Sequence, residues 1–227
     1  GTIWGGEFLV AGLADFERAA HLRAWPLPGG AASVRDARRN AFALLGELDL
    51  LEHPGATGLL GSLDEQTRRV TATMIERNIN SPRTSSMGRL FDAAAAILGI
   101  CERATYEGEP AIELEAAARR ALDGKNVSAI GSQVDVSALA DGSPTLDPQP
   151  LFEALLNGIA GGTPAGRLAL DFHIAIARAS ACLASEICVR KGIDTVVLSG
   201  GVFMNRLLLR LLTRKLEDTG LTVLVPC

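Results

Sequence analysis

The sequence predicts an α/β protein, on three observations. Near the C-terminus, two short apolar runs at 194–199 and 221–225 flank a helical pattern at 203–218. Such a strand–helix–strand unit needs a crossover, so its two strands should be parallel. Residues 3–27 alternate weakly between apolar and polar, which indicates an antiparallel strand pair. Most of the chain between these two regions has helical periodicity.

The first half of the chain begins with the antiparallel pair, whose loop is expected near Gly12 to Asp15. Pro-Gly-Gly then breaks the pattern, and two helices follow at roughly 33–47 and 62–78. Residues 80–100 start with Ser, Thr and Pro, which favour a loop, and then become helical. Ser85 or Ser86 is expected to cap this helix, because a hydroxyl there can accept from a free backbone amide.

The second half begins with a helix at about 110–123, where Pro110 suits the first turn. Residues 126–147 predict a second hairpin that turns at Ala-Asp-Gly-Ser-Pro. A short helix near 149–158 and a long helix at about 164–191 precede the terminal strand–helix–strand unit.

Composition limits the possible functions. The 227 residues are 48% hydrophobic, enough for one large domain or two small ones. With 22 basic and 26 acidic residues the net charge is −4, which gives no electrostatic case for a nucleic-acid partner. Four cysteines in no Cys-x-x-Cys pattern suggest a reducing, cytoplasmic setting. No signal peptide or uninterrupted membrane-length apolar run is visible, so no membrane partner is expected.

The segment 195–205, "TVVLSGGVFMN", carries the clearest local signal of a site. One interpretation is a tight turn, since glycine adopts backbone conformations that other residues resist. The other is a ligand site, since bare backbone amides and a helix N-terminus attract phosphate or sugar oxygens. Ser199 and Asn205 would add polar groups on the same side; in the alternative interpretation Asn205 only caps the helix. Ligands of open α/β sheets bind at the carboxyl ends of strands.

Three further polar residues are candidates, each with an ordinary structural alternative. Asp92 lies one turn after Gly88 at a helix start. It would accept hydrogen bonds from ligand hydroxyls, or it is an ordinary acidic residue that the helix dipole favours near an N-terminus. The same two alternatives hold for Glu113. His173 is on a helix that is apolar on most faces, which favours a satisfied core residue over a ligand. No two histidines have the i, i+4 spacing of a helical metal site, so the sequence predicts no metal ligand.

Five segments of the chain, taken together and in this order, resemble the HypF family of hydrogenase maturation carbamoyltransferases. The segments are "GTIWGGEFL", "HLRAWPLPGG", "NSPRTSSMGRLFDAAAAILGI", "YEGEPAIELE" and "LSGGVFMNRLLL". The resemblance spans nearly the whole chain and extends to the TsaD-type tRNA-modification proteins. It implies an α/β fold of the actin/hexokinase/Hsp70 superfamily, with mixed sheets, flanking helices and a nucleotide cleft. Residues 1–227 would form one TsaD-like carbamoyltransferase domain.

The resemblance implies a two-stage activity. An upstream domain uses carbamoyl phosphate and ATP to make carbamoyl-adenylate. The domain seen here passes the carbamoyl group to the C-terminal cysteine thiolate of the partner HypE, for the cyanide ligand of nickel–iron hydrogenase. Two alternatives stay open: an O-carbamoyltransferase that acts on a small-molecule hydroxyl, and a non-catalytic protein-binding module of the same fold.

The resemblance also implies a set of nucleotide-binding positions. Asp92 matches the Asp of Gly-x-x-(Phe/Leu)-Asp, and Glu113 matches a sugar-hydroxyl ligand in Pro-x-Ile-Glu. TsaD proteins usually have Gly where Glu109 stands, so the backbone contact there is the least direct match. The full implied set is Asp92, Gly108, Glu109, Glu113, Ser199, Gly200, Gly201 and Asn205. No residue is singled out as catalytic.

The metal of the family is expected outside this chain. The resemblance implies a divalent Fe or Zn ion, held by a His-x-x-x-His motif upstream of Gly1 and by a carboxylate in an Asn-Asp-Gly-Gly segment beyond Cys227. The chain starts inside a glycine-rich turn and stops directly after an apolar run. We therefore expect a fragment that lacks its metal-binding N-terminal part and its C-terminal end, and that is inactive alone.

Overall fold

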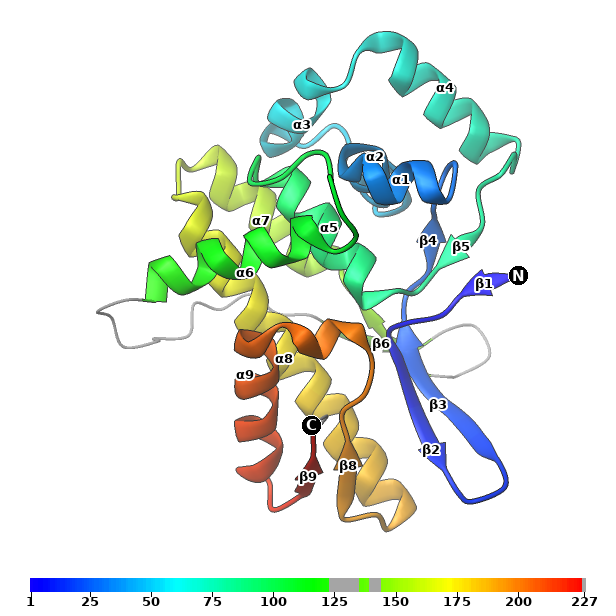
Figure 1. The fold of residues 1–227 in the computed structure, drawn as a ribbon, viewed down its shortest axis with the longest axis vertical. Helices are drawn as coiled ribbons and strands as arrows, with labels where there is room; N and C mark the ends of the chain where they lie inside the picture. Colours follow the sequence, from blue (N-terminus) through cyan, green and yellow to red (C-terminus); the bar gives the residue numbers. More distant parts are fainter. Residues whose placement is uncertain (123–134, 139–143, 226–227) are drawn as a thin grey trace.

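A computed structural model of the chain describes residues 1–122, 135–138 and 144–225 (Figure 1). The strands are β1 (Thr2–Ile3), β2 (Glu7–Ala11), β3 (Phe16–Leu22), β4 (Trp25–Pro26), β5 (Arg83–Thr84), β6 (Asp135–Ala138), β7 (Pro144–Asp147), β8 (Thr195–Val197) and β9 (Thr222–Leu224). The α-helices are α1 (Ala31–Arg35), α2 (Ala37–Glu47), α3 (Thr57–Ser62), α4 (Glu65–Glu76), α5 (Met87–Ile97), α6 (Glu109–Leu122), α7 (Gln149–Ala160), α8 (Ala165–Lys191) and α9 (Arg206–Glu217). Two 3-10 helices are η1 (Pro54–Ala56) and η2 (Gly201–Met204).

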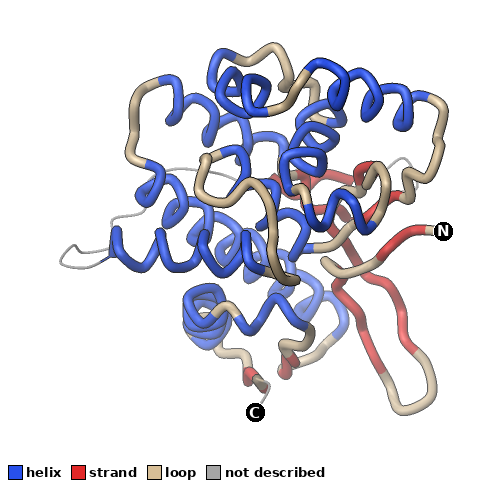
Figure 2. Tube along the Cα trace, turned by 45° about the horizontal axis from the view of Figure 1, so that its top comes forward, coloured by secondary structure: helices blue, strands red, loops and turns tan. Residues whose placement is uncertain are grey.

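The described strands form three small sheets, two of them mixed, and helices make up most of the rest of the described chain (Figure 2). In the order β2-β3-β7-β6, the β2–β3 and β6–β7 pairs are antiparallel and β3–β7 is parallel. A second sheet has the order β1-β5-β4, and β8 pairs with β9 in parallel. The predicted α/β class, the N-terminal antiparallel pair and the parallel terminal strands are therefore confirmed.

Two predicted helices differ from the structure at an aspartate. The helix predicted at 33–47 is split at Asp36, which leaves the helical conformation (φ −110°, ψ 89°) and pairs through its backbone with Arg103. The helix predicted at 62–78 begins only at Glu65, because Asp64 caps it by accepting from the Thr67 amide at 2.8 Å.

Two other predicted segments agree with the structure only in part. The helix predicted from 203 starts at Arg206, after the 3-10 turn η2. The predicted second hairpin is present as β6 and β7, but residues 126–134 and the first four residues of its predicted turn at 140–144 lie outside the described residues.

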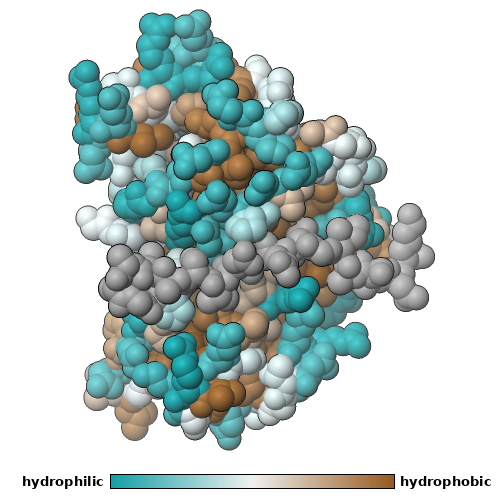
Figure 3. All heavy atoms as spheres, turned by 180° about the vertical axis from the view of Figure 1, so that it is seen from behind, coloured by the Kyte–Doolittle hydropathy of each residue, from teal (hydrophilic) through white to brown (hydrophobic). Residues whose placement is uncertain are grey.

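The long helix α8 is the centre of the core, and α6, α7 and α9 all pack on it. Its Phe172 meets Phe91 of α5 and Phe152 of α7 edge to face, with ring centroids 5.0 and 5.9 Å apart. Such pairs contribute about 0.5–1.5 kcal/mol each beyond their burial, so they fix α5 against α8. By length and composition α8 could also cross a membrane, but 67% of its most apolar window is buried inside the protein, as in a core helix. Seen from behind, polar and apolar residues are interspersed over the surface (Figure 3).

The start of α5 is held by the glycines at the N-terminus of the chain. Met87 donates its backbone amide to the Gly5 carbonyl at 3.2 Å. A Cβ atom on Gly6 would lie 2.5 Å from the Ser85 carbonyl oxygen. Ser86 caps α5 by accepting from the Arg89 amide, as predicted. The placement of α5 therefore depends on a close backbone approach that only glycine permits.

Candidate functional site

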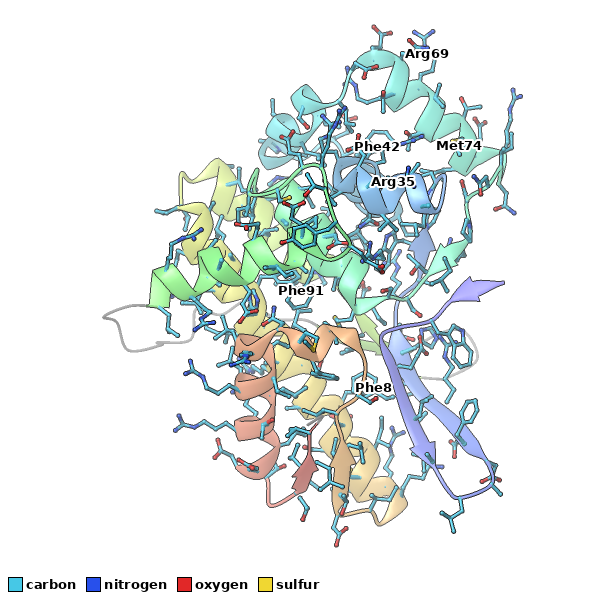
Figure 4. All side chains as sticks on the ribbon, viewed as in Figure 1. Phe8, Arg35, Phe42, Arg69, Met74 and Phe91 are labelled. Carbon is cyan, nitrogen blue, oxygen red and sulfur yellow. The ribbon has the colours of Figure 1, made fainter. Side chains whose placement is uncertain are left out.

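The eight predicted nucleotide-binding residues come from three segments that meet in space. They are α5, the loop and first turns of α6, and the connection from β8 to α9. Helix α5 contacts both α6 and η2. Phe91, at the junction of these elements, is labelled in Figure 4. The fold thus brings the connection from β8 to α9 next to two helices that begin more than 80 positions earlier in the sequence.

Asp92 is a buried carboxylate with incomplete partners. Its side chain is 2% exposed, and Arg89 Nη1 lies 2.8 Å from Oδ2. Neither carboxylate oxygen accepts a hydrogen bond of normal geometry from the described residues. Burial raises the pKa of Asp92 to about 6, while the Arg89 guanidinium and the Ala111 backbone amide oppose the rise. A buried acceptor in this state favours any hydroxyl donor that can reach it, because an unmade hydrogen bond is costly.

Glu109, Glu113 and Asp92 all affect the same thiol, that of Cys101. Burial raises the pKa of the Cys101 thiol, and Glu109, Glu113 and Asp92 raise it further in that order. All three carboxylates therefore act on the thiol through charge, which shows that each lies within electrostatic range of Cys101.

Glu109 also has a local role that explains its presence. Its carboxylate accepts from the backbone amide and the hydroxyl of Thr105, and these bonds lower its pKa. Gly108 precedes it at φ +84°, a conformation that favours glycine. Glu109 therefore closes the turn into α6 with its side chain, a function that the Gly of TsaD proteins cannot perform.

The Ser-Gly-Gly segment forms an exposed turn after β8. Ser199, Gly200 and Gly201 are all exposed. Gly200 has φ +105° and ψ 162°, which a residue with a side chain adopts only under strain. A Cβ on either glycine would meet no atom within 4 Å, so the space over the turn is open. The backbone of residues 199–201 is therefore accessible here, whereas the first amides of α9 are already bonded, that of Leu207 to Glu115 and that of Leu208 to Asn205.

Asn205 links this turn to the core. Its Oδ1 accepts from the Leu208 amide at 2.9 Å, so the capping interpretation is confirmed. Its Nδ2 lies 2.9 Å from Nε2 of His173, whose Nδ1 lies 2.7 Å from the Ala169 carbonyl. Burial lowers the pKa of His173 to about 4, which keeps the ring neutral at physiological pH. His173 is thus the satisfied core residue that the sequence favours, and contact between Asn205 and a nucleotide stays a prediction.

The structure adds residues that the sequence patterns did not single out. Glu115 accepts from the Leu207 amide at 3.2 Å, so this carboxylate of α6 bonds to the start of α9. Arg89 forms an ion pair with Asp92. Its i, i+3 spacing from Asp92 on a helix could have predicted this pair from the sequence. The pairing of His173 with Asn205 had no local signal, because the two are 32 positions apart.

Two surface hollows lie elsewhere. One, of about 720 Å³, is between α8 and α9 and includes Cys182 and Lys215. The other, of about 850 Å³, includes Arg35 and Asp64. Neither is lined by any of the eight predicted residues. Because the Asp92 oxygens are buried, a ligand that bonds to them must first displace a neighbouring group.

The described residues do not fit the divalent metal that the resemblance implies. Within 1–122, 135–138 and 144–225, no three His, Cys, Asp or Glu side chains gather as a metal-binding group. Cys101, Cys182 and Cys188 are unpaired, and burial raises the pKa of each thiol. These thiols are therefore poor nucleophiles at neutral pH.

Comparison with known proteins places this geometry in context. A family model described as "Carbamoyltransferase, Kae1-like Domain, second subdomain" matches residues 1–227. A HypF carbamoyltransferase homologue of Cupriavidus necator is 38% identical over 236 residues, which cover 100% of this chain and 57% of that protein. HypF of Rhodobacter capsulatus is 35% identical over 97% of this chain and 27% of its own length.

Two solved structures have the same fold. One is full-length HypF in a phosphate- and nucleotide-bound form, with TM-score 0.86 and 31% identity over 98% of this chain and 33% of the other. The second is HypF of T. kodakarensis, with TM-score 0.79 and 34% identity over 98% of this chain and 28% of the other. The fold expected from the resemblance is confirmed.

Proposed function

The chain belongs to the HypF family of carbamoyltransferases, as the second subdomain of their Kae1-like domain, and we propose that it holds a nucleotide during carbamoyl transfer. The chain spans 57% of one curated relative and 27% of another. The activity of the whole protein, its substrates and its partners are therefore part of the proposal.

The observation that carries the proposal is the state of Asp92. A carboxylate that is 2% exposed and accepts no regular hydrogen bond is costly to keep in a core. Ligand hydroxyls, such as those of a ribose, would supply the missing donors. The solved HypF structure in a phosphate- and nucleotide-bound form supports a nucleotide as that ligand.

The other residues have complementary roles in this proposal. The exposed backbone around Gly200 and Gly201 favours a phosphate group, because amides without neighbouring side chains can approach its oxygens. Asn205 can add a polar contact at the start of α9. Glu113, half-buried on α6, would bond to a second sugar hydroxyl.

The proposed reaction starts from carbamoyl-adenylate, made from carbamoyl phosphate and ATP. The thiolate of the C-terminal cysteine of HypE attacks the carbamoyl carbon. A C–S bond forms, the C–O bond to the phosphate breaks, and AMP leaves with the electron pair. The residues of this chain orient the adenylate and stabilise the negative charge on the leaving phosphate. A cytoplasmic location belongs to this proposal, and the unpaired described cysteines support it.

Substitution of Asn205 tests the nucleotide site. We expect Asn205→Ala in the full-length protein to weaken ATP binding about 5- to 100-fold, because one polar contact is removed. It should also destabilise α9 by roughly 0.5–2 kcal/mol, because the cap is lost. Calorimetric titration measures the first effect and thermal melting the second.

Asn205→Ser is the matched control, because a Ser hydroxyl still caps the helix. We expect this variant to melt above Asn205→Ala, because the cap is kept while both variants lose the bond to His173, and to bind ATP as weakly as Asn205→Ala. If Asn205→Ala changes only the melting temperature, the nucleotide contact is refuted. Thiocarbamate formation on HypE, with carbamoyl phosphate and ATP supplied, should fall in step with affinity. Transfer to a small-molecule hydroxyl instead would favour the O-carbamoyltransferase alternative.

A further inference from the structure

We propose that His173 is a positioning residue of the nucleotide site, which acts by fixing the orientation of the Asn205 side-chain amide. The inference rests on the proposed function, because it assigns His173 a part in the same site. It goes beyond that function by naming a residue that is fully buried and reaches the ligand only through another side chain.

The hydrogen bonds of His173 determine its tautomer. Nδ1 lies 2.7 Å from the carbonyl oxygen of Ala169, which can only accept. Nδ1 must therefore carry the proton, and in a neutral ring Nε2 is then an acceptor. The group opposite Nε2 is Nδ2 of Asn205, a donor, at 2.9 Å. Each contact of the ring thus joins a donor to an acceptor.

The tautomer in turn sets the orientation of the amide. Oδ1 of Asn205 faces the Leu208 amide, which can only donate, at 2.9 Å. Rotating the amide by half a turn would place Oδ1 against the lone pair of His173 Nε2, and would place Nδ2 against the Leu208 N–H. Both contacts would then be repulsive, so only one orientation satisfies the neighbours.

This orientation leaves a defined group for a ligand. Nδ2 carries two hydrogens and His173 takes one of them, so one N–H remains. The amide therefore offers a donor, which suits a phosphate or ribose oxygen.

Packing holds the imidazole in place. The ring meets Phe91 edge to face at 5.1 Å and Phe172 at 6.3 Å. Phe91 is the neighbour of Asp92 in α5, so the same packing joins the two halves of the proposed site. A residue that only filled this space could be replaced by an apolar one of similar size; a positioning residue could not.

Two polar substitutions separate these roles. The amide of Gln can place its oxygen near the position of Nε2, where it accepts from Asn205. The amide of Asn reaches only the position of Nδ1, so it can bond to Ala169 but not to Asn205. In the full-length protein we expect His173→Gln to bind ATP within about threefold of the wild type. His173→Asn should bind about 5- to 30-fold more weakly.

A double-mutant cycle then tests whether His173 acts through Asn205. His173→Asn combined with Asn205→Ala should bind ATP no more weakly than Asn205→Ala alone. The comparison uses only the ATP affinity that changes in Asn205→Ala, because another domain of the full-length protein is also proposed to bind ATP. Circular dichroism and melting curves confirm that each variant is folded.

The outcomes distinguish this inference from the function on which it rests. If Asn205→Ala leaves ATP affinity unchanged, the proposed nucleotide site itself fails. If Asn205→Ala weakens binding but the Gln and Asn variants of His173 bind alike, the positioning role is overturned and the function stands. Additive effects in the double mutant would also overturn it. Rescue by Gln together with non-additivity supports it.

Discussion

Replacing Asp92 with Asn is expected to weaken nucleotide binding by the full-length protein about a hundredfold. In the proposed site the carboxylate accepts from ligand hydroxyls inside the core, where the residue is 1% exposed. Hydrogen bonds to a charged group contribute about 1.5–3 kcal/mol each, so two of them correspond to this loss. Asn has the same shape but carries no charge, and only one of its two terminal groups can accept from a hydroxyl. Calorimetric titration with ATP measures the change.

The pH dependence of nucleotide binding tests whether the ionised carboxylate of Asp92 binds the ligand. The pKa of its carboxyl group is about 6. At pH 5 roughly one-tenth of the groups are ionised, so binding should be about tenfold weaker than at pH 7.5. The Asp92→Asn variant should lack this tenfold loss of affinity. Any pH dependence of binding that remains in the variant comes from protonation of the nucleotide phosphates. If the wild type and the Asp92→Asn variant have the same pH profile, the assignment is refuted.

The stability of the unliganded protein should change with pH in the opposite direction. The pKa of Asp92 is raised in the folded state from 3.8 to about 6, so the native state holds the proton more tightly than the unfolded chain. Its contribution is therefore fully present below about pH 4 and is lost as pH rises through 6. The loss is of order 3 kcal/mol in the wild type. Asp92→Asn should remove this slope, although it also leaves Arg89 without its ion-pair partner.

The local sequence pattern was sufficient to predict those elements whose structure is determined by residues nearby in the sequence. The terminal strand–helix–strand unit follows from two apolar runs and one helical period, and β8 and β9 lie within their predicted ranges while α9 starts three positions late, at Arg206. Asn205 could be predicted as a cap because its side chain bonds three positions along the chain. The same holds for Ser86 at the start of α5.

Local pattern was insufficient where partners come from distant segments. The break at Asp36 depends on pairing with Arg103, far along the chain. The hydrogen bond from the Leu207 amide to Glu115 depends on how α6 lies against the start of α9. The sequence of either helix alone does not determine that arrangement. For the site, sequence motifs identified Asp92, but its lack of hydrogen-bond partners is visible only in the packed structure.

The last prediction concerns Gly6, which controls the position of α5 and therefore of Asp92. We expect Gly6→Ala to destabilise this region by about 3 kcal/mol, the upper part of the usual range for overpacking. The new Cβ would lie 2.5 Å from the Ser85 carbonyl oxygen and 2.9 Å from Leu22 Cβ, and both belong to buried residues. The strand cannot easily retreat, because the Gly6 carbonyl accepts from the Leu22 amide at 2.8 Å.

Hydrogen exchange in the full-length protein measures this effect locally. Amides of α5 should exchange about a hundredfold faster in Gly6→Ala than in the wild type, since 3 kcal/mol corresponds to roughly that factor. Gly58→Ala is the matched control, because its Cβ would meet no atom within 4 Å in the exposed first turn of α3. Alanine there should leave exchange in α5 unchanged and slightly favour α3. Unchanged α5 exchange in Gly6→Ala would show that Ser85 can move away, and that the close approach of Gly6 does not hold Asp92 in place.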